Sequence, residues 1–121
     1  MLSLTRKTDY ALIAAAYLAD RHRRGQGPAS ARTIAEAFDL PRPLLMNVLK
    51  SLSQEGLVSS TRGAGGGYEL AADPARLDLL TVARAVEGAG EAEDHPAIRR
   101  LRDRLEAELA GLTLADLLED F

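Results

Sequence analysis

Residues 30–70 read SARTIAEAFDLPRPLLMNVLKSLSQEGLVSSTRGAGGGYEL, and this stretch decides the fold. Ser30 is a good N-cap and predicts a short helix over about residues 31–38. Residues 39–41 read Asp-Leu-Pro, which is typical of a tight turn. Pro43 suits the first turn of a further helix, because its missing N–H costs nothing there. The stretch therefore begins as two helices joined by a tight turn.

A hairpin is predicted after these helices. Gly56 is the expected C-cap of the second one. A strand over residues 57–61, a glycine-rich reversal over 62–67 and a return strand over 68–70 follow. Helix, short helix, turn, helix and hairpin, in this order, form the winged helix-turn-helix arrangement, whose second motif helix enters the major groove of DNA.

The rest of the chain is predicted to be helical, which makes the fold class mostly α with a small two-stranded antiparallel β-wing. The predicted elements are a helix over residues 4–24, a helix over 79–86 capped by Thr81, a polar loop over 87–94, a long helix opened by Asp94 and Pro96 and ending near Ala110, and a turn over 114–118 capped by Thr113. We expect residues 1–72 to form the winged helix-turn-helix domain. Residues 73–121 form a helical linker and dimerisation segment, compact with the first.

Composition is that of one globular domain. The chain has 121 residues, of which 46% are hydrophobic, 27% charged and only 4% aromatic, so the core must be aliphatic. The absence of cysteine excludes disulfides, zinc–thiolate sites, thiol nucleophiles and cysteine-ligated iron–sulfur clusters. The longest apolar stretch, residues 10–19, is too short to cross a bilayer and has no secretory cleavage pattern, so the cytoplasm is the expected location.

Charge is divided unevenly along the chain. Residues 1–70 carry nine Lys+Arg and six Asp+Glu, a balance of +3, whereas residues 71–121 carry six and twelve, a balance of −6. This asymmetry fits a basic working face joined to an acidic assembly segment. Ordinary surface charge is the alternative interpretation.

The helix after the turn has two different faces at 100° per residue. Its apolar face carries Leu44, Leu45, Val48, Leu49 and Leu52, and its polar face carries Pro43, Asn47, Lys50, Ser51 and Gln54. The polar side chains are of the kinds that read base edges or hold phosphates, and Arg42 at the helix start is a further candidate contact. The simpler alternative is a solvated face of an ordinary amphipathic helix.

The glycine-rich reversal is the second candidate DNA contact. Glycines such as Gly65 and Gly66 permit positive φ and a close approach of backbone to a surface. Arg62 could enter a minor groove, where the negative potential attracts arginine. A flexible turn with an exposed arginine is the alternative. A phosphate-binding loop is poorly supported, because a Tyr-Glu-Leu strand follows the glycines instead of Lys-Ser/Thr and a helix.

The last long helix carries an apolar stripe close to the period of a straight helix. The stripe consists of Ile98, Leu101, Leu105, Leu109 and Leu112. We interpret it as a dimerisation surface that crosses a second copy, and the alternative is a helix packed on its own domain. A dimer makes physical sense because a single small winged domain makes too few contacts for tight, specific DNA binding.

Several short segments together resemble one family of regulators. They are residues 9–12 (DYAL), 33–36 (TIAE), 52–59 (ending GLVS), 62–68 (RGAGGGY), 87–88 (EG) and 112–117 (LTLADL). The chain is similar to the winged helix-turn-helix regulators of iron–sulfur and cysteine metabolism that include IscR, NsrR and CymR. The resemblance implies a homodimer on a pseudo-palindromic operator, with the helix bearing Asn47 and Lys50 in the major groove and the wing in the minor groove. It also implies that Arg62 is the wing arginine.

The chain departs from the cluster-bearing members of this family. Those members carry three cysteines in the loop before the last long helix, and residues 88–94 have none. His95 lies near a histidine ligand of some members, and Asp9 lies near a carboxylate ligand of others. We interpret His95 as a helix-start residue and Asp9 as an ordinary first-helix carboxylate, because two such ligands without thiolates cannot hold an iron–sulfur cluster. We therefore predict no metal site and no cofactor.

These observations favour a sequence-specific regulator that binds double-stranded DNA as a homodimer, acting as a repressor and without a membrane partner. The alternative is a protein-interaction module that regulates an enzyme or another regulator without binding DNA. An enzyme is disfavoured, because the chain has two histidines, no cysteine and no paired carboxylates or nucleophile–base pattern that we can place in a pocket.

Overall fold

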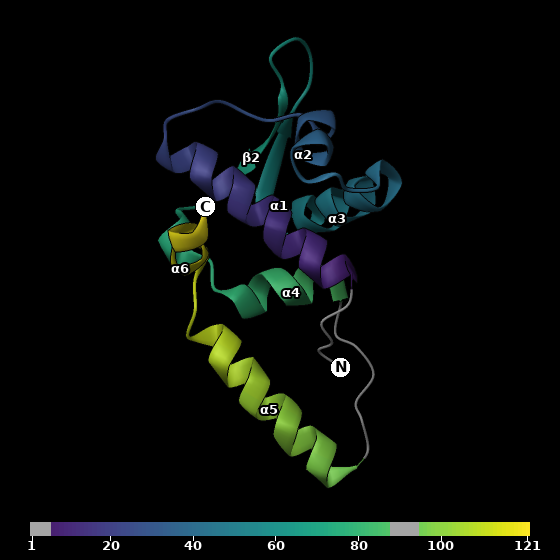
Figure 1. The fold of residues 1–121 in the computed structure, drawn as a ribbon, viewed down its shortest axis with the longest axis vertical. Coiled ribbons are helices and arrows are strands. Elements are labelled where there is room, and N and C mark those ends of the chain that lie inside the picture. Colours follow the sequence, from purple (N-terminus) through teal and green to yellow (C-terminus); the bar gives the residue numbers. More distant parts are fainter. Residues whose placement is uncertain (1–5, 88–94) are drawn as a thin grey trace.

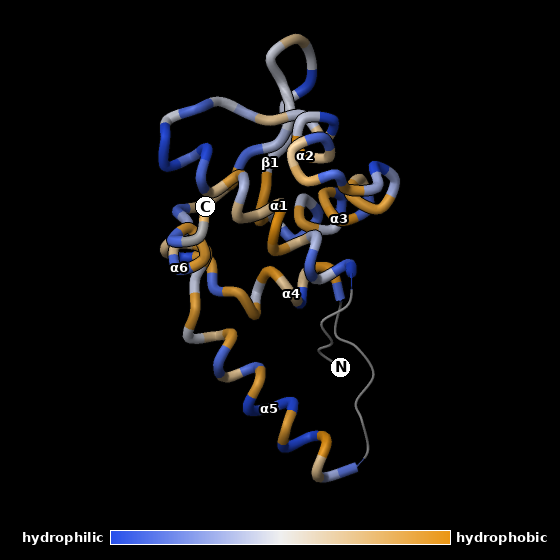
Figure 2. The backbone as a smooth tube through the Cα atoms, viewed as in Figure 1, coloured by the Kyte–Doolittle hydropathy of each residue, from blue (hydrophilic) through white to orange (hydrophobic). Residues whose placement is uncertain are grey.

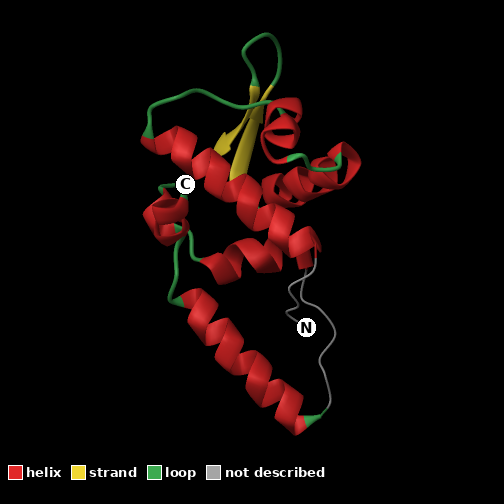
Figure 3. Ribbon diagram, in the orientation of Figure 1, coloured by secondary structure: helices red, strands yellow, loops and turns green. Residues whose placement is uncertain are grey.

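The structure, a computed structural model, describes residues 6–87 and 95–121 (Figure 1). The elements are α1 (Arg6–Arg23), α2 (Ala31–Phe38), α3 (Arg42–Gln54), β1 (Val58–Thr61), β2 (Gly67–Leu70), the 3-10 turn η1 (Pro74–Arg76), α4 (Leu79–Glu87), α5 (Pro96–Ala110), α6 (Leu114–Leu117) and the 3-10 turn η2 (Leu118–Asp120). The predicted mostly-α fold with one small antiparallel sheet is confirmed (Figure 3). None of the described helices is long and apolar enough to cross a membrane.

Local residues fix both ends of α2 and the turn that leads to α3. Ser30 caps α2 as predicted, because its Oγ accepts a bond of 3.0 Å from the backbone N–H of Thr33. Asp39 ends α2 in the left-handed region with φ of 53°, a conformation that aspartate tolerates better than most side chains. Pro41 then precedes the first residue of α3. Residues 39–41 thus turn the chain sharply between α2 and α3.

Two predicted caps are wrong in detail. The α4 cap is Asp78, whose carboxylate accepts bonds of 2.9 Å from the Thr81 backbone N–H and 2.8 Å from the Thr81 hydroxyl. Asp78 precedes the helix and so can reach its free N–H groups, whereas Thr81 already lies inside the first turn. At the end of α3, Glu55 is the C-cap, and Gly56 follows it with φ of +75°, the position where glycine is favoured.

The last long helix ends at Ala110 and a short helical turn follows Thr113, as predicted. His95 is the N-cap of α5, and its Nδ1 accepts a bond of 3.1 Å from the Ala97 backbone N–H. Thr113 begins α6, and the Asp116 carboxylate accepts a bond of 2.8 Å from its backbone N–H. Residues 4 and 5 of the predicted first helix, and residues 88–94 of the predicted polar loop with Asp94, lie outside the described residues.

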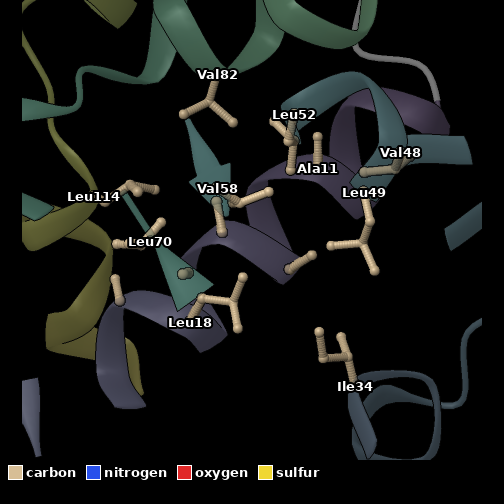
Figure 4. Packing of buried hydrophobic residues seen from close by; sticks show 14 of the residues in the cluster. Ala11, Leu18, Ile34, Val48, Leu49, Leu52, Val58, Leu70, Val82 and Leu114 are labelled. Atoms are coloured by element: carbon tan, nitrogen blue, oxygen red, sulfur yellow. The ribbon is translucent and has the colours of Figure 1, made fainter. Parts of the chain in front are cut away.

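The hydrophobic core surrounds α1, which runs between the helix-turn-helix and wing on one side and α4 and α6 on the other (Figure 1). Alanines line much of α1, and Ala11 and Ala14 are fully buried, so neighbouring helices can approach closely. Leu18, Ile34, Leu49 and Leu114 are among the large side chains that fill this core (Figure 4). One continuous cluster therefore joins the helix-turn-helix and the wing to α4 and α6.

The long helix α5 is the exception to this packing. None of its side chains, all of which the structure describes, is buried. It contacts α4, and Figure 1 shows it extending away from the wing end of the molecule. The chain then returns to the core through α6. Two backbone hydrogen bonds hold this return in place: the Leu79 N–H donates to the Leu112 carbonyl at 2.8 Å, and the Leu114 N–H donates to the Leu77 carbonyl at 2.9 Å. A helix is thus held at one end and exposed along its length.

Candidate nucleic-acid interface

Helix α3 is anchored by an apolar face that leaves its polar face outside. Leu45, Val48, Leu49 and Leu52 are 0% exposed, whereas Leu44 is only half-buried. These positions recur at three- and four-residue spacing and so lie on one side of the helix. The opposite side must face solvent, which fixes the direction in which the candidate contact residues point.

The candidate contact residues lie on that solvent side, as predicted from the sequence. Arg42, Pro43, Asn47, Lys50 and Gln54 are exposed, and Ser51 is half-buried at the edge of the face. Within the described ranges neither Arg42 nor Lys50 forms an ion pair. The helix itself contains no acidic residue. The face therefore offers two unneutralised cations beside amide groups, which suits an anionic partner with a hydrogen-bonding surface.

The wing is a two-stranded antiparallel sheet with Arg62 at the start of its tip. Val58 pairs with Leu70 and Thr61 with Gly67, and Arg62 is exposed without an ion pair in the described part of the chain. Ala29, in the segment before α2, pairs with Tyr68 through backbone bonds of 2.9 Å and 2.7 Å. The wing is thus tied to the entrance of the helix-turn-helix.

Glycines of the wing divide into two groups. Gly63 and Gly65 have φ of +97° and +76° with open space around them, so they shape the tip. Gly66 and Gly67 instead approach backbone closely. A Cβ on Gly66 would lie 2.2 Å from the Thr61 carbonyl oxygen, and one on Gly67 would lie 2.5 Å from the Ala29 carbonyl oxygen. The requirement for glycine at Gly66 and Gly67 therefore comes from packing within the protein.

Three other arginines of the first two helices and the segment between them are paired with carboxylates. The Asp20 carboxylate accepts bonds from Arg23 at 2.6 Å and Arg24 at 3.1 Å. Partial desolvation would raise the pKa of Asp20, but the hydrogen bonds from the two arginines outweigh it and hold the pKa below its usual value. Arg32 on α2 pairs with Glu36 at 3.0 Å. Arg42, Lys50 and Arg62, in contrast, are exposed and form no ion pair with the described residues.

Helix α5 presents a second surface, of opposite character. Ile98, Leu101, Leu105 and Leu112 of the predicted stripe are 41%, 55%, 48% and 41% exposed. Leu109, the fifth predicted member, is half-buried and packs against the core cluster. Figure 2 shows hydrophobic positions recurring along this helix where it stands apart from the core. Three large apolar side chains thus face solvent along α5, and Leu112 does so just after the helix ends.

Comparison with known proteins identifies the family. A family model described as Rrf2, iron-dependent transcriptional regulator, matches residues 4–120. This chain belongs to the Rrf2 family. The HTH-type transcriptional regulator CymR of Bacillus subtilis is 33% identical over 125 residues, covering 96% of this chain and 89% of CymR. Because such relatives are named as transcriptional regulators, the chain is a DNA-binding regulator and not an enzyme.

Solved structures agree with this Rrf2 assignment. The structure of T. potens IscR is similar with a TM-score of 0.83 and 33% identity, covering 98% of this chain and 88% of that one. The structure of CymR, described as the global cysteine regulator of B. subtilis, is similar with a TM-score of 0.83 and 32% identity, covering 100% of this chain and 99% of CymR. The predicted winged helix-turn-helix fold is confirmed by these similarities.

The iron in the family description does not fit the donor set of this chain. Iron–sulfur clusters are held mainly by cysteine thiolates, and the sequence has no cysteine. Within residues 6–87 and 95–121 no three His, Cys, Asp or Glu side chains lie together as a metal site. His95 uses its Nδ1 to cap α5, and Asp9 is exposed in the first turn of α1. The regulator therefore lacks the thiolates that such a cluster requires.

One residue of the α3 surface was missed by the sequence analysis. Met46 is 43% exposed, although a hydrophobic residue was not expected outside the apolar face. It lies four residues after Arg42 and four before Lys50, so all three occupy one ridge of the helix. The signal that could have found it is its helical angle, which falls between those two cations and not among the buried leucines.

Proposed function

We propose that this Rrf2-family regulator is a repressor that binds a pseudo-palindromic operator as a homodimer. The polar face of α3 would enter the major groove, and Arg62 on the wing would enter the minor groove. The observation that carries the proposal is the arrangement of α3, whose leucines hold it in the core while Arg42, Asn47 and Lys50 stay exposed. Arg62 and the α3 cations would then bind one duplex from adjacent sites.

The exposed stripe of α5 supports the dimer. Three large apolar side chains on α5, with Leu112 just after it, are costly to leave in water, and a second copy offers an identical stripe to cover them. A twofold dimer would present two copies of α3, and the two half-sites of a palindrome mirror that symmetry. The α5 helix is suited to this role because none of its side chains is buried and it extends away from the rest of the described fold (Figure 1).

Repression follows from the position of such a dimer on DNA. A dimer that occupies both half-sites of an operator within a promoter excludes other proteins from the same segment of duplex. Because its ligand is chromosomal DNA, we place the regulator in the cytoplasm.

Asn47 and Gln54 are the proposed readers of base edges, since their amides can pair with adenine, while Arg42, Lys50 and Ser51 hold phosphates or bases. Gly65, which has open space around it, would let the wing backbone lie close to the duplex, with Gly66 beside it, and Pro43 would contact the duplex at the start of α3.

Selection of genomic fragments on the purified protein tests the proposal. We expect retained fragments to share an inverted repeat, and the affinity for them to fall steeply as salt rises, because phosphate contacts release counterions. Arg62→Ala should weaken binding by roughly 1–3 kcal/mol. The matched control is Arg76→Ala, which removes an exposed arginine on η1 outside the proposed surface. Fragments without a shared repeat, or binding that does not respond to salt, would contradict the proposal.

A further inference from the structure

Among the described residues from 6 to 87, Met46 is the only large hydrophobic side chain that is exposed. The other exposed large hydrophobics are Phe121 and the α5 stripe residues Ile98, Leu101, Leu105 and Leu112. Met46 is therefore separated along the described chain from the other exposed large hydrophobic side chains. A single exposed methionine needs no explanation on an ordinary surface, but this one stands in the middle of a charged ridge.

The ridge has the order cation, methionine, cation. Arg42 lies one turn before Met46 and Lys50 one turn after it, and both are exposed and unpaired in the described part of the chain. Asn47 follows Met46 on the neighbouring ridge. An apolar protein partner would have to approach between two unneutralised cations. A duplex instead offers phosphates at the edges of its groove and methyl groups on the groove floor, which matches this order of side chains.

We propose that Met46 is a specificity residue that reads a thymine by apolar contact with its C5 methyl group. The inference rests on the proposed binding of α3 in the major groove. The thymine methyl is the only apolar group that base edges present there. Methionine is suited to the contact because its long, unbranched and polarizable side chain adapts to the position of a methyl group. Asn47 beside it has the donor and acceptor pair that recognises adenine, so each half-site would contain an A·T pair under this part of α3.

Replacement of thymine by deoxyuridine tests this contact, because the two bases differ only by the methyl group. The operator selected from genomic fragments is synthesised with deoxyuridine at one thymine position of each half-site in turn, and affinities are measured by fluorescence anisotropy. At one position we expect about fourfold weaker binding per methyl removed, the value that corresponds to one buried methylene. In Met46→Ala the duplexes with thymine and deoxyuridine should bind equally, whereas Met46→Leu should keep part of the preference.

Arg42→Gln provides the matched control on the same ridge. It should weaken binding to both duplexes and keep the fourfold preference for thymine, because it removes a charge and leaves the methyl contact. Because Met46 is exposed, the thermal midpoint of Met46→Ala should stay close to that of the native protein. The inference is overturned if no thymine is sensitive, or if Met46→Ala keeps the full preference, while the proposed function survives both results. Failure of the native protein to select any operator would remove both.

Discussion

Helices α3 and α5 are both amphipathic, yet they are turned in opposite directions. In α3 the leucines at Leu45, Leu49 and Leu52 are 0% exposed and the polar residues face solvent. In α5 the residues Leu101 and Leu105 are 55% and 48% exposed. The difference shows that an apolar stripe in the sequence does not indicate by itself whether the stripe packs within its own chain.

The inner side of α5 strengthens this contrast, because it is polar. The side chains of Arg102 and Glu106 are only 12% and 18% exposed, and Arg102 Nε lies 3.9 Å from Glu106 Oε1. Glu106 also pairs with Arg84 of α4, so a three-residue ion network fastens the helix to its own domain. Arg102 Nη1 is buried without a hydrogen-bond partner in the part of the chain that the structure describes. Thus α5 turns Arg102 and Glu106 toward its own domain beside Leu109, and leaves Ile98, Leu101 and Leu105 facing solvent. Its exposed apolar residues contrast with the buried leucines of α3 and suit a helix that meets a second chain.

The largest effect is expected from charges on the outer side of α5. Leu101→Glu combined with Leu105→Glu would place carboxylates inside the proposed dimer interface, which should weaken the dimer by about 3 kcal/mol or more. Sedimentation should then show monomers at concentrations where the native protein is a dimer, and operator affinity should fall at least in proportion. The matched control is Ala107→Glu, which adds a carboxylate to an exposed position on the opposite side of the same helix. An unchanged dimer in the double variant would mean that α5 is not the interface.

Truncation of one leucine in each helix should separate folding from assembly. Leu49→Ala should lower the free energy of unfolding by about 2–5 kcal/mol at every protein concentration, because it opens a cavity in the core. Leu101→Ala should leave the monomer fold intact and lower the thermal midpoint in a way that depends on protein concentration, because binding of a second copy stabilises the folded state. Calorimetry at several concentrations checks both. The contrast between the helices fails if the two variants respond alike.

Sequence reasoning succeeded where each position is decided locally. Ser30, Pro43 and the glycine-rich hairpin fixed the order of elements, and the three- and four-residue spacing of leucines in α3 fixed its orientation. The Thr81 cap was wrong although the helix start at Leu79 was right, because Asp78 stands directly before that start and was the competing cap. Leu109 was assigned to the outer stripe of α5, although it packs on the core, because the direction of a helix axis relative to its own domain is a tertiary property. Met46 was missed because an apolar side chain beside two cations is not part of a pattern of polar contacts.

Removal of one cation from α3 and of one from α5 should change the salt dependence of operator binding to different extents. Lys50→Ala on α3 should weaken binding to all sequences about equally and reduce the slope of log affinity against log salt by about 1, because one phosphate contact is lost. Arg100→Ala on α5 removes an equally exposed cation and should leave that slope unchanged. Titration of the operator at several salt concentrations gives both slopes. Equal slopes for the two variants would show that α3 does not lie nearer the phosphates than α5 does.

The smallest effect concerns the polar attachment of α5 to its own domain. Arg84→Ala removes the exposed partner of Glu106 and should cost about 0–1 kcal/mol in the free energy of unfolding, because the Arg84 side chain is 60% exposed and its ion pair is screened by solvent. The loss should shrink at high salt, whereas the loss from Leu49→Ala should persist, since a cavity does not respond to ionic screening. Arg76→Ala, on η1 and away from α5, is the control for loss of an arginine. A salt-independent loss in Arg84→Ala would show that this arginine stabilises α5 through the packing of its aliphatic stem instead of its charge.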